Sequence, residues 1–284
     1  MRRFALSVFA LASVAQQPSV KPITARQVIE RIQKEVGVPW NGNTVDTFKD
    51  GDPETPVTGI ATTFAATMDV LRRSAASGKN LIIAHEPTFY NHQDKTTGME
   101  SDAVLGEKRE FIAKHRIVVW RFHDHWHARN PDGILTGMTE ALGWEKFRSP
   151  RNPHLFVLPE TTLARFAADT RDRLKIHAPR VVGDPQMKMT KVSLMPGASG
   201  ADSQIRALER DDVEVLVVGE SREWETVEYV RDAVGEGKRK ALVLLGHVPS
   251  EEAGMKECAR WLKTFLPGVP VEFIPAGEPF WTPK

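Results

Sequence analysis

Apolar residues recur along this chain in two patterns, one with the period of a helix and one as short continuous runs. Apolar side chains three and four residues apart predict a helix over residues 24–36, with Val28 and Ile32 on its buried face. Continuous runs such as Leu81–Ala84 and Ala241–Leu245 predict strands that are buried on both faces. The same signals predict further helices over 64–76, 104–115, 135–142, 161–174, 201–209, 223–234 and 251–265, and further strands over 57–62, 117–122, 155–158, 191–195, 213–218 and 269–274.

This alternation of helix and strand is typical of an α/β fold with parallel or mixed sheets. The alternation breaks at residues 148–153, where Pro150 and Pro153 interrupt both patterns. We therefore predict two α/β domains with mixed sheets, one over 23–149 and one over 150–284. The C-terminal segment of the second domain is a candidate to return to the first.

The first fifteen residues differ from the rest of the chain. Two arginines precede an apolar run over 4–14, and small residues occupy 13–15, which is the pattern of a cleaved secretory signal peptide over 1–15. Residues 16–22 then form a polar linker. The alternatives are a frayed amphipathic helix and a retained anchor, although the run is too short to span a membrane. The expected mature protein is secreted or periplasmic and has no membrane span.

Composition and charge exclude several classes of protein. The chain is 41% hydrophobic and 26% charged, as in ordinary globular domains. Its formal net charge of +1 argues against nucleic acid as a partner. The single cysteine, Cys258, excludes a disulfide framework and is interpreted as a small buried residue.

Two pairs of histidine and carboxylate follow the two buried runs described above. His85 and Glu86 follow the first run, and His247 and Glu251 follow the second, four residues apart. Imidazole and carboxylate are ligands of zinc, iron and manganese, and ligand sites in open α/β folds lie at the carboxyl ends of strands. The alternatives are a helix cap for Glu251 and an ordinary loop histidine for His85.

A third cluster follows the strand expected over 117–122 and contains His123, His125 and His127. An extended segment would place all three imidazoles on one face, which is costly to bury without protons or a metal ion. An exposed polar loop is the alternative. Together, the three clusters predict a metal site between the two domains. Glu86, if it is not a ligand, is the first candidate for the general base, and His123 is the second.

The remaining polar motifs carry weaker signals. The glycine-rich turn over 196–200 precedes an expected helix and is a candidate anion cradle. It lacks the lysine of a P-loop and the spacing of a dinucleotide fingerprint, so a tight turn is the better interpretation. Four further histidines lack comparable neighbours and are interpreted as surface or edge residues: His92, His115, His154 and His177.

These motifs resemble those of the Nif-three-like dinuclear metal-centre family, whose bacterial members are often named GTP cyclohydrolase I type 2 homologues. The resemblance extends from about Thr24 to Phe280. The family's strand ending in His-His-Pro corresponds to Ile-Ile-Ala-His-Glu-Pro at 82–87, and its His-x-Asn-x-Asp segment corresponds to 123–127. Its Gly-His-x-x-Ser-Glu motif is intact at 246–251 and is the most specific match.

The resemblance implies a toroidal homohexamer of two-domain subunits with one or two divalent metal ions, either zinc, iron or manganese. The metal ligands that it implies are His85, Glu86, His127, His247 and Glu251. Glu86 stands where the family has a second histidine, and His127 stands where the family has an aspartate that bridges two ions. An imidazole has one lone pair for a metal and does not ordinarily bridge.

The leading functional hypothesis is a metal-dependent hydrolase acting on a small phosphorylated or nucleotide-like substrate. In such an enzyme the metal lowers the pKa of water and polarises a phosphoryl or carbonyl oxygen. The alternative hypothesis is a non-catalytic metal-binding oligomeric scaffold, because structural metal sites are closed whereas catalytic ones keep an open coordination position.

We predict that the mature protein begins near Gln16, because the positive, apolar and small-residue zones end there. Amino-terminal sequencing of protein isolated from its native host checks this prediction. Retention of Met1 on the native protein would contradict it.

Overall fold

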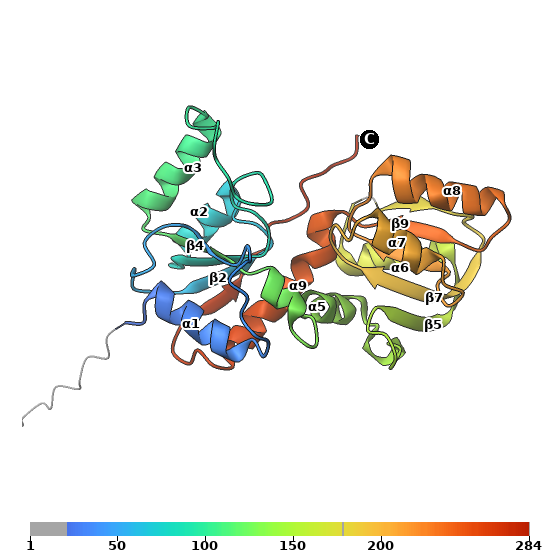
Figure 1. Ribbon diagram of the computed structural model, residues 1–284, viewed down its shortest axis with the longest axis horizontal. Coiled ribbons are helices and arrows are strands. Elements are labelled where there is room, and N and C mark those ends of the chain that lie inside the picture. The colour runs from blue at the N-terminus through green and yellow to red at the C-terminus, as the bar shows by residue number, and fades with distance from the viewer. Residues whose placement is uncertain (1–21, 178, 284) are drawn as a thin grey trace, which may run out of the picture.

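Two mixed sheets, each covered by helices, organise the chain in the computed structural model (Figure 1), which describes residues 22–177 and 179–283. The expected leader, and all but the last residue of the expected linker, lie outside the described residues. The predicted fold class, two α/β domains with mixed sheets, is confirmed.

The first sheet has the strand order β1-β4-β3-β2-β10. Strands β2, β3, β4 and β10 are parallel, whereas β1 pairs antiparallel with β4 at one edge. Successive residues of β3 pack on opposite faces: Leu81 and Ile83 belong to the core under α1, α5 and α9, and Ile82 and Ala84 belong to the core under α2 and α3. The bounds are α1 Ala25–Glu35, β1 Phe48–Asp50, β2 Ile60–Thr63, α2 Met68–Ala76, β3 Leu81–Ala84, α3 Ala103–Lys114, β4 Val118–Arg121, α4 Asp124–Ala128, α5 Gly133–Leu142 and β10 Val271–Phe273.

The second sheet has the order β5-β7-β8-β9-β6, with β7, β8 and β9 parallel and an antiparallel strand at each edge. Helices α7 and α8 cover one face, where Leu216 and Leu242 are buried, and α6 covers the other. The bounds are η1 Glu145–Phe147, β5 Leu155–Thr162, α6 Leu163–Leu174, β6 Arg180–Val182, β7 Lys188–Met195, α7 Ala201–Leu208, β8 Val215–Val218, the π-helix η2 Glu223–Val227, α8 Glu228–Gly235, β9 Ala241–Leu244 and α9 His247–Lys263.

Several helices begin at residues other than those predicted, because local capping interactions determine where a helix starts. Thr24 and Gln27 form a reciprocal capping box at the start of α1. The helix expected from residue 64 begins at Met68, because the Thr67 side chain caps it. The helix expected from residue 251 begins at His247. The periodic signals did not reveal β1, β6 or α4, which are only three to five residues long.

Helix α9 connects the two domains. It begins two residues after β9 of the second sheet, and its middle lies against the first sheet, where the Thr62 hydroxyl donates a hydrogen bond to the Met255 carbonyl (2.7 Å). After α9 the chain adds β10 beside β2, so the C-terminal segment lies in the first sheet. Among the described residues, no helix combines the length and apolar character needed to cross a membrane.

Helices α5 and α9 approach closely because a glycine stands at each contact. A Cβ atom on Gly254 would lie 2.5 Å from the Ile134 Cα, and a Cβ on Gly137 would lie 2.6 Å from the Gly254 Cα. Both neighbours are backbone atoms, which cannot move aside without shifting a helix. The spacing of the two helices therefore depends on these glycines.

We expect Gly254→Ala to destabilise the protein by about 1–3 kcal/mol, as overpacking of a close-packed interior does. Gly106→Ala is the matched control, since Gly106 lies in helix α3 with open space around its Cα, and should stabilise by about 0.5–1 kcal/mol through its higher helix propensity. Urea unfolding of both variants measures the difference. Equal stability of Gly254→Ala and the wild type would show that the helices separate at no cost.

Candidate metal centre

The ends of three strands bring histidines and carboxylates from both domains to one place. His85 and Glu86 follow β3, and His123 follows β4 after one intervening residue. His247 and Glu251 occupy the first turns of α9, directly after β9. A cavity of about 1210 Å³ opens over them; its lining includes Glu86, His123, His127, His247 and Glu251.

The buried carboxylate of Glu251 lies at the centre of the cluster. Its Oε2 is 3.2 Å from the His247 Nε2 and 3.4 Å from the His85 Nε2. Its Oε1 is 3.8 Å from the His127 Nε2. The structure therefore brings His85 and His247, which are 162 positions apart in the sequence, to the same oxygen atom.

Glu86 forms the second carboxylate of the cluster and faces two imidazoles. Its Oε1 lies 3.4 Å from the His247 Nε2 and 3.5 Å from the His123 Nε2, while its Oε2 accepts a hydrogen bond from Arg121 (3.1 Å). Burial acts to raise the pKa of Glu86, but the bond to His247 and the nearby positive charges outweigh it and hold that pKa below its ordinary value. Glu86 is therefore ionised at neutral pH.

Three of the imidazoles present the same nitrogen to the cluster. The Nδ1 of His85 donates to the Phe122 carbonyl (3.0 Å), that of His123 to Asp124 (2.9 Å), and that of His127 to Asp132 (3.0 Å). Each bond fixes the tautomer and leaves the Nε2 lone pair free. This pairing of a ligating imidazole with a carbonyl or carboxylate is typical of metal sites.

Two buried atoms of the cluster lack a hydrogen-bond partner among the described residues. They are the His85 Nε2 and the Glu251 Oε2, which face each other. Desolvation lowers the pKa of His85 well below its ordinary value, so its imidazole is neutral. A divalent cation would satisfy both atoms, and two sets of three ligand atoms lie within 4.8 Å of one another: His85, His123 and His127, and His85, Glu86 and Glu251. The donor set thus fits a metal ion.

Two imidazoles of the cluster, His247 and His127, have raised pKa values. Burial acts to lower the pKa of His247, but the neighbouring carboxylates of Glu251 and Glu86 prevail and raise it to about 10. Burial likewise opposes protonation of His127, and Asp132 reverses that effect and raises its pKa. Without a cation, the two carboxylates therefore attract protons onto the neighbouring imidazoles.

The expectation that His123, His125 and His127 share one face was wrong. Residues 124–128 form the short helix α4, so His123 and His127, four apart, face the cluster while His125 turns away. His125 stacks on Trp40 with ring centroids 3.7 Å apart. Its Nδ1 donates to Asp46, and its Nε2 accepts from the Asn41 amide, so both nitrogens are satisfied.

Sequence reasoning missed the residues that position the ligands. Asp46 accepts hydrogen bonds from the backbone amides of 123, 124 and 125, which starts α4 at this point. Arg121 is completely buried and donates to the carbonyls of His85 and His92 and to Glu86. The sequence offered one signal for the positioning role of Arg121, which is its place at the carboxyl end of strand β4. His92 and His154, interpreted above as ordinary surface or edge residues, also line the cavity.

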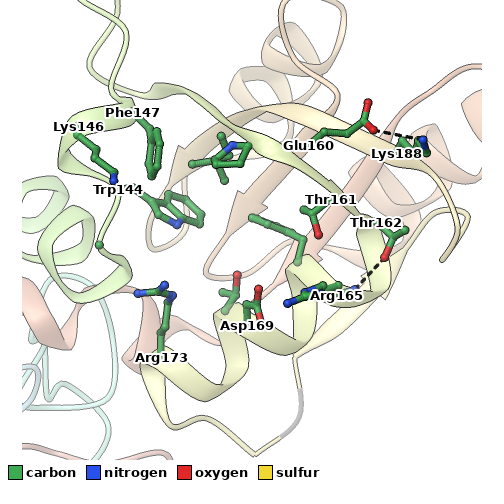
Figure 2. A pocket seen from close by; sticks show the side chains of 15 residues that line it. Trp144, Lys146, Phe147, Glu160, Thr161, Thr162, Arg165, Asp169, Arg173 and Lys188 are labelled. Atoms are coloured by element: carbon green, nitrogen blue, oxygen red, sulfur yellow. Dashed lines mark hydrogen bonds and ion pairs between the residues drawn. The ribbon is translucent and has the colours of Figure 1, made fainter.

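A second cavity, of about 800 Å³, lies between η1, β5 and α6 of the second domain (Figure 2). Its lining includes Trp144, Arg165 and Arg173, and Lys188 forms an ion pair with Glu160 at its edge. None of the histidines of the cluster lines it. The candidate site is therefore the cavity over the histidine and carboxylate cluster.

Comparison of this chain with known sequences identifies the family to which it is similar. The sequence model of Duf34/NIF3 (NGG1p interacting factor 3) matches residues 27–279. A GTP cyclohydrolase 1 type 2 homolog of Clostridium perfringens is 24% identical over 162 residues, and the alignment covers 54% of this chain and 60% of that relative. A protein of the same name from Chlamydia pneumoniae is 22% identical over 239 residues, which is 81% of this chain and 88% of the relative.

Solved structures share the fold at low sequence identity. The Staphylococcus aureus hypothetical protein SA1388 has a TM-score of 0.73 and 18% identity, covering 92% of this chain and all of that one. A Bacillus cereus protein related to NIF3 has a TM-score of 0.73 and 16% identity, covering 93% of this chain and all of that one. The family resemblance predicted from the sequence is confirmed.

The wall of the cavity includes a buried lysine, Lys108 of α3. Its ammonium group donates to the Thr88 carbonyl (2.6 Å) and lies 5.2 Å from the centre of the Tyr90 ring. Burial lowers the pKa of Lys108 to about 8, and only Asp94 acts in the opposite direction. An unfolded lysine has a pKa of about 10.4, so between pH 8 and this value the unfolded chain binds more protons and stability rises with pH.

We expect the wild type to gain about 1–2 kcal/mol of unfolding free energy relative to Lys108→Met between pH 7 and pH 9.5, because one pKa unit corresponds to about 1.4 kcal/mol. Urea unfolding at both pH values measures this gain. Lys114→Met, which removes an exposed lysine from the same helix, should follow the wild type. An identical pH response of Lys108→Met and the wild type would contradict the lowered pKa.

Proposed function

Because the chain belongs to the Duf34/NIF3 family, we propose that it is a metal-dependent hydrolase acting on a small phosphorylated or nucleotide-like substrate. One observation carries the proposal: the histidine and carboxylate cluster lies at an open cavity large enough for such a substrate. The names of the two curated relatives suggest GTP as a probe.

The proposed ligands are His85, Glu86, His127, His247 and Glu251, which hold one or two ions of zinc, iron or manganese. Such an ion lowers the pKa of water and polarises a phosphoryl oxygen. An open side of the cluster toward the cavity supports catalysis over a closed structural role.

Part of the cavity wall carries groups that bind anions. Helices α7 and α9 both begin at its edge after a glycine, and neither has a side-chain cap among the described residues. The free amides and positive dipole of a helix start attract phosphate. Lys108 adds a cation at the same cavity, and the exposed rings of Tyr90 and Phe280 on its lining offer flat surfaces to a base.

Proton transfer was assigned above to Glu86 and then His123. The lowered pKa of Glu86 makes it a weak base near neutral pH, where a general base works best with a pKa close to the working pH. The free Nε2 of His123 faces the other imidazoles. These features support a ligand role for Glu86 and add His123 to the proposed ligands, so a bound ion would supply the activation of water that a strong general base would otherwise provide. We also propose that the leader is cleaved during export and that the mature protein assembles as a homohexamer.

We expect metal-free protein to be inactive and protein reloaded with zinc, iron or manganese to release phosphate from GTP or from p-nitrophenyl phosphate. His247→Ala should reduce the rate by at least about 10–100-fold, because loss of only a supporting partner of a metal ligand already costs that much. Phosphate release, measured beside metal content, checks this expectation. His115→Ala, an exposed histidine at the end of α3, is the matched control.

Metal binding at full stoichiometry without turnover on either substrate class would contradict the hydrolase. That result would favour the non-catalytic metal-binding scaffold, which requires the same ligands but no reaction.

A further inference from the structure

The two sets of three ligand atoms described for the candidate metal centre share one residue. His85 belongs to both sets, yet its Nδ1 is bonded to the Phe122 carbonyl and only its Nε2 is free. An imidazole nitrogen has a single lone pair and does not bridge two ions. His85 can therefore serve only one metal position at a time.

The three imidazoles form the more regular of the two sets. The ring centroids of His85, His123 and His127 form a near-equilateral triangle, with separations of 4.7, 4.9 and 5.0 Å. Each Nδ1 is held by a carbonyl or carboxylate oxygen, and each Nε2 is free. Helix α4 produces this arrangement by placing His123 and His127 one turn apart on the side that faces His85.

When His85 joins the imidazole triangle, Glu86 and Glu251 of the other set keep a different imidazole, His247, beside them. The His247 Nε2 lies 3.4 Å from the Glu86 Oε1 and 3.2 Å from the Glu251 Oε2, so one imidazole stands between two carboxylates. The other oxygen of Glu251 lies 3.8 Å from the His127 Nε2. Glu251 thus extends between the two sets, as a carboxylate shared by two neighbouring ions does.

We propose that this centre has two chemically different positions: a three-imidazole position formed by His85, His123 and His127, which takes zinc, and a position formed by Glu86, His247 and Glu251, which takes manganese. The inference rests on the metal centre of the proposed function. Imidazole ligands suit zinc, whereas carboxylates suit the harder manganese ion. Two carboxylates at one position also offset the charge of the second ion and reduce its repulsion from the first.

The substitutions that distinguish this chain from the family pattern are the source of the asymmetry. With Glu86 and His127 at these positions, one metal position has two carboxylates and the imidazole of His247, and the other has three imidazoles. An exchange of the two residue types would mix both ligand classes at each position. The separation of ligand types is therefore a property of these two residues.

The test uses the mature protein that begins at Gln16. A chelator first removes bound metal, and the protein then receives one equivalent of zinc followed by excess manganese. Zinc is added first and in limited amount, because it binds most sites more tightly than manganese. Elemental analysis should find one zinc and one manganese per chain, and manganese electron paramagnetic resonance should report one bound ion. These readouts do not depend on turnover.

Two variants separate the positions. His123→Ala should weaken zinc binding by at least about 10–100-fold, the loss that removal of a ligand's supporting partner already causes, and leave manganese bound. Glu86→Gln should weaken manganese binding to the same extent and leave zinc bound. His127→Asp, which restores the family residue, should admit manganese to the zinc position and so raise the manganese content. His154→Ala is the matched control, since His154 lines the same cavity and bonds instead to the Leu194 carbonyl.

Circular dichroism and urea unfolding show whether each variant folds, and His127→Asp provides a second route should His123→Ala unfold. Loss of both metals in parallel from His123→Ala and Glu86→Gln would overturn the inference, as would random occupation of both positions by the two ions. Full selectivity without turnover would leave the inference standing and contradict only the hydrolase. A protein that binds neither ion would overturn both.

Discussion

One buried carboxylate, Glu251, lies where the two domains meet and faces side chains from both. An ionised carboxylate withdrawn from water is costly unless charges or hydrogen bonds compensate it. In this protein the imidazoles that face it come from both domains: His247 from the start of α9, His85 from the end of β3 and His127 from α4. The Glu251 Oε2 still lacks a hydrogen-bond partner among the described residues, so a cation between it and these imidazoles would supply the missing compensation.

Two further features keep that meeting point rigid. Gly137 and Gly254 let α5 and α9 pack with their backbones in contact, so α9 has little freedom to slide. On the other side, Arg121 anchors the segment after β3 through its bonds to the carbonyls of His85 and His92. A centre with ligands from distant parts of the chain requires this kind of support, because small displacements separate ligand atoms from an ion.

The ligand chemistry of the site combines family features with features of this chain. His247 and Glu251 belong to the intact Gly-His-x-x-Ser-Glu motif, and their spacing on the first turns of α9 places two candidate ligands on one helix face. Glu86 and His127 are the departures, and each has a supporting partner that suits its own chemistry, Arg121 for the carboxylate and Asp132 for the imidazole. The surroundings of both residues thus match the residues present.

The sequence by itself determined the alternation of strands and helices and the location of the histidine–carboxylate motifs at strand ends. Runs such as Leu81–Ala84 are readable because a strand buried on both faces must be apolar throughout. The direction of each histidine was decided only by the tertiary structure. The alternation over 123–127 fits a strand as well as a helix, and the helical turn forms because Asp46, 77 residues earlier, accepts three of its amides. Local sequence cannot specify a hydrogen bond whose acceptor arrives from another part of the fold.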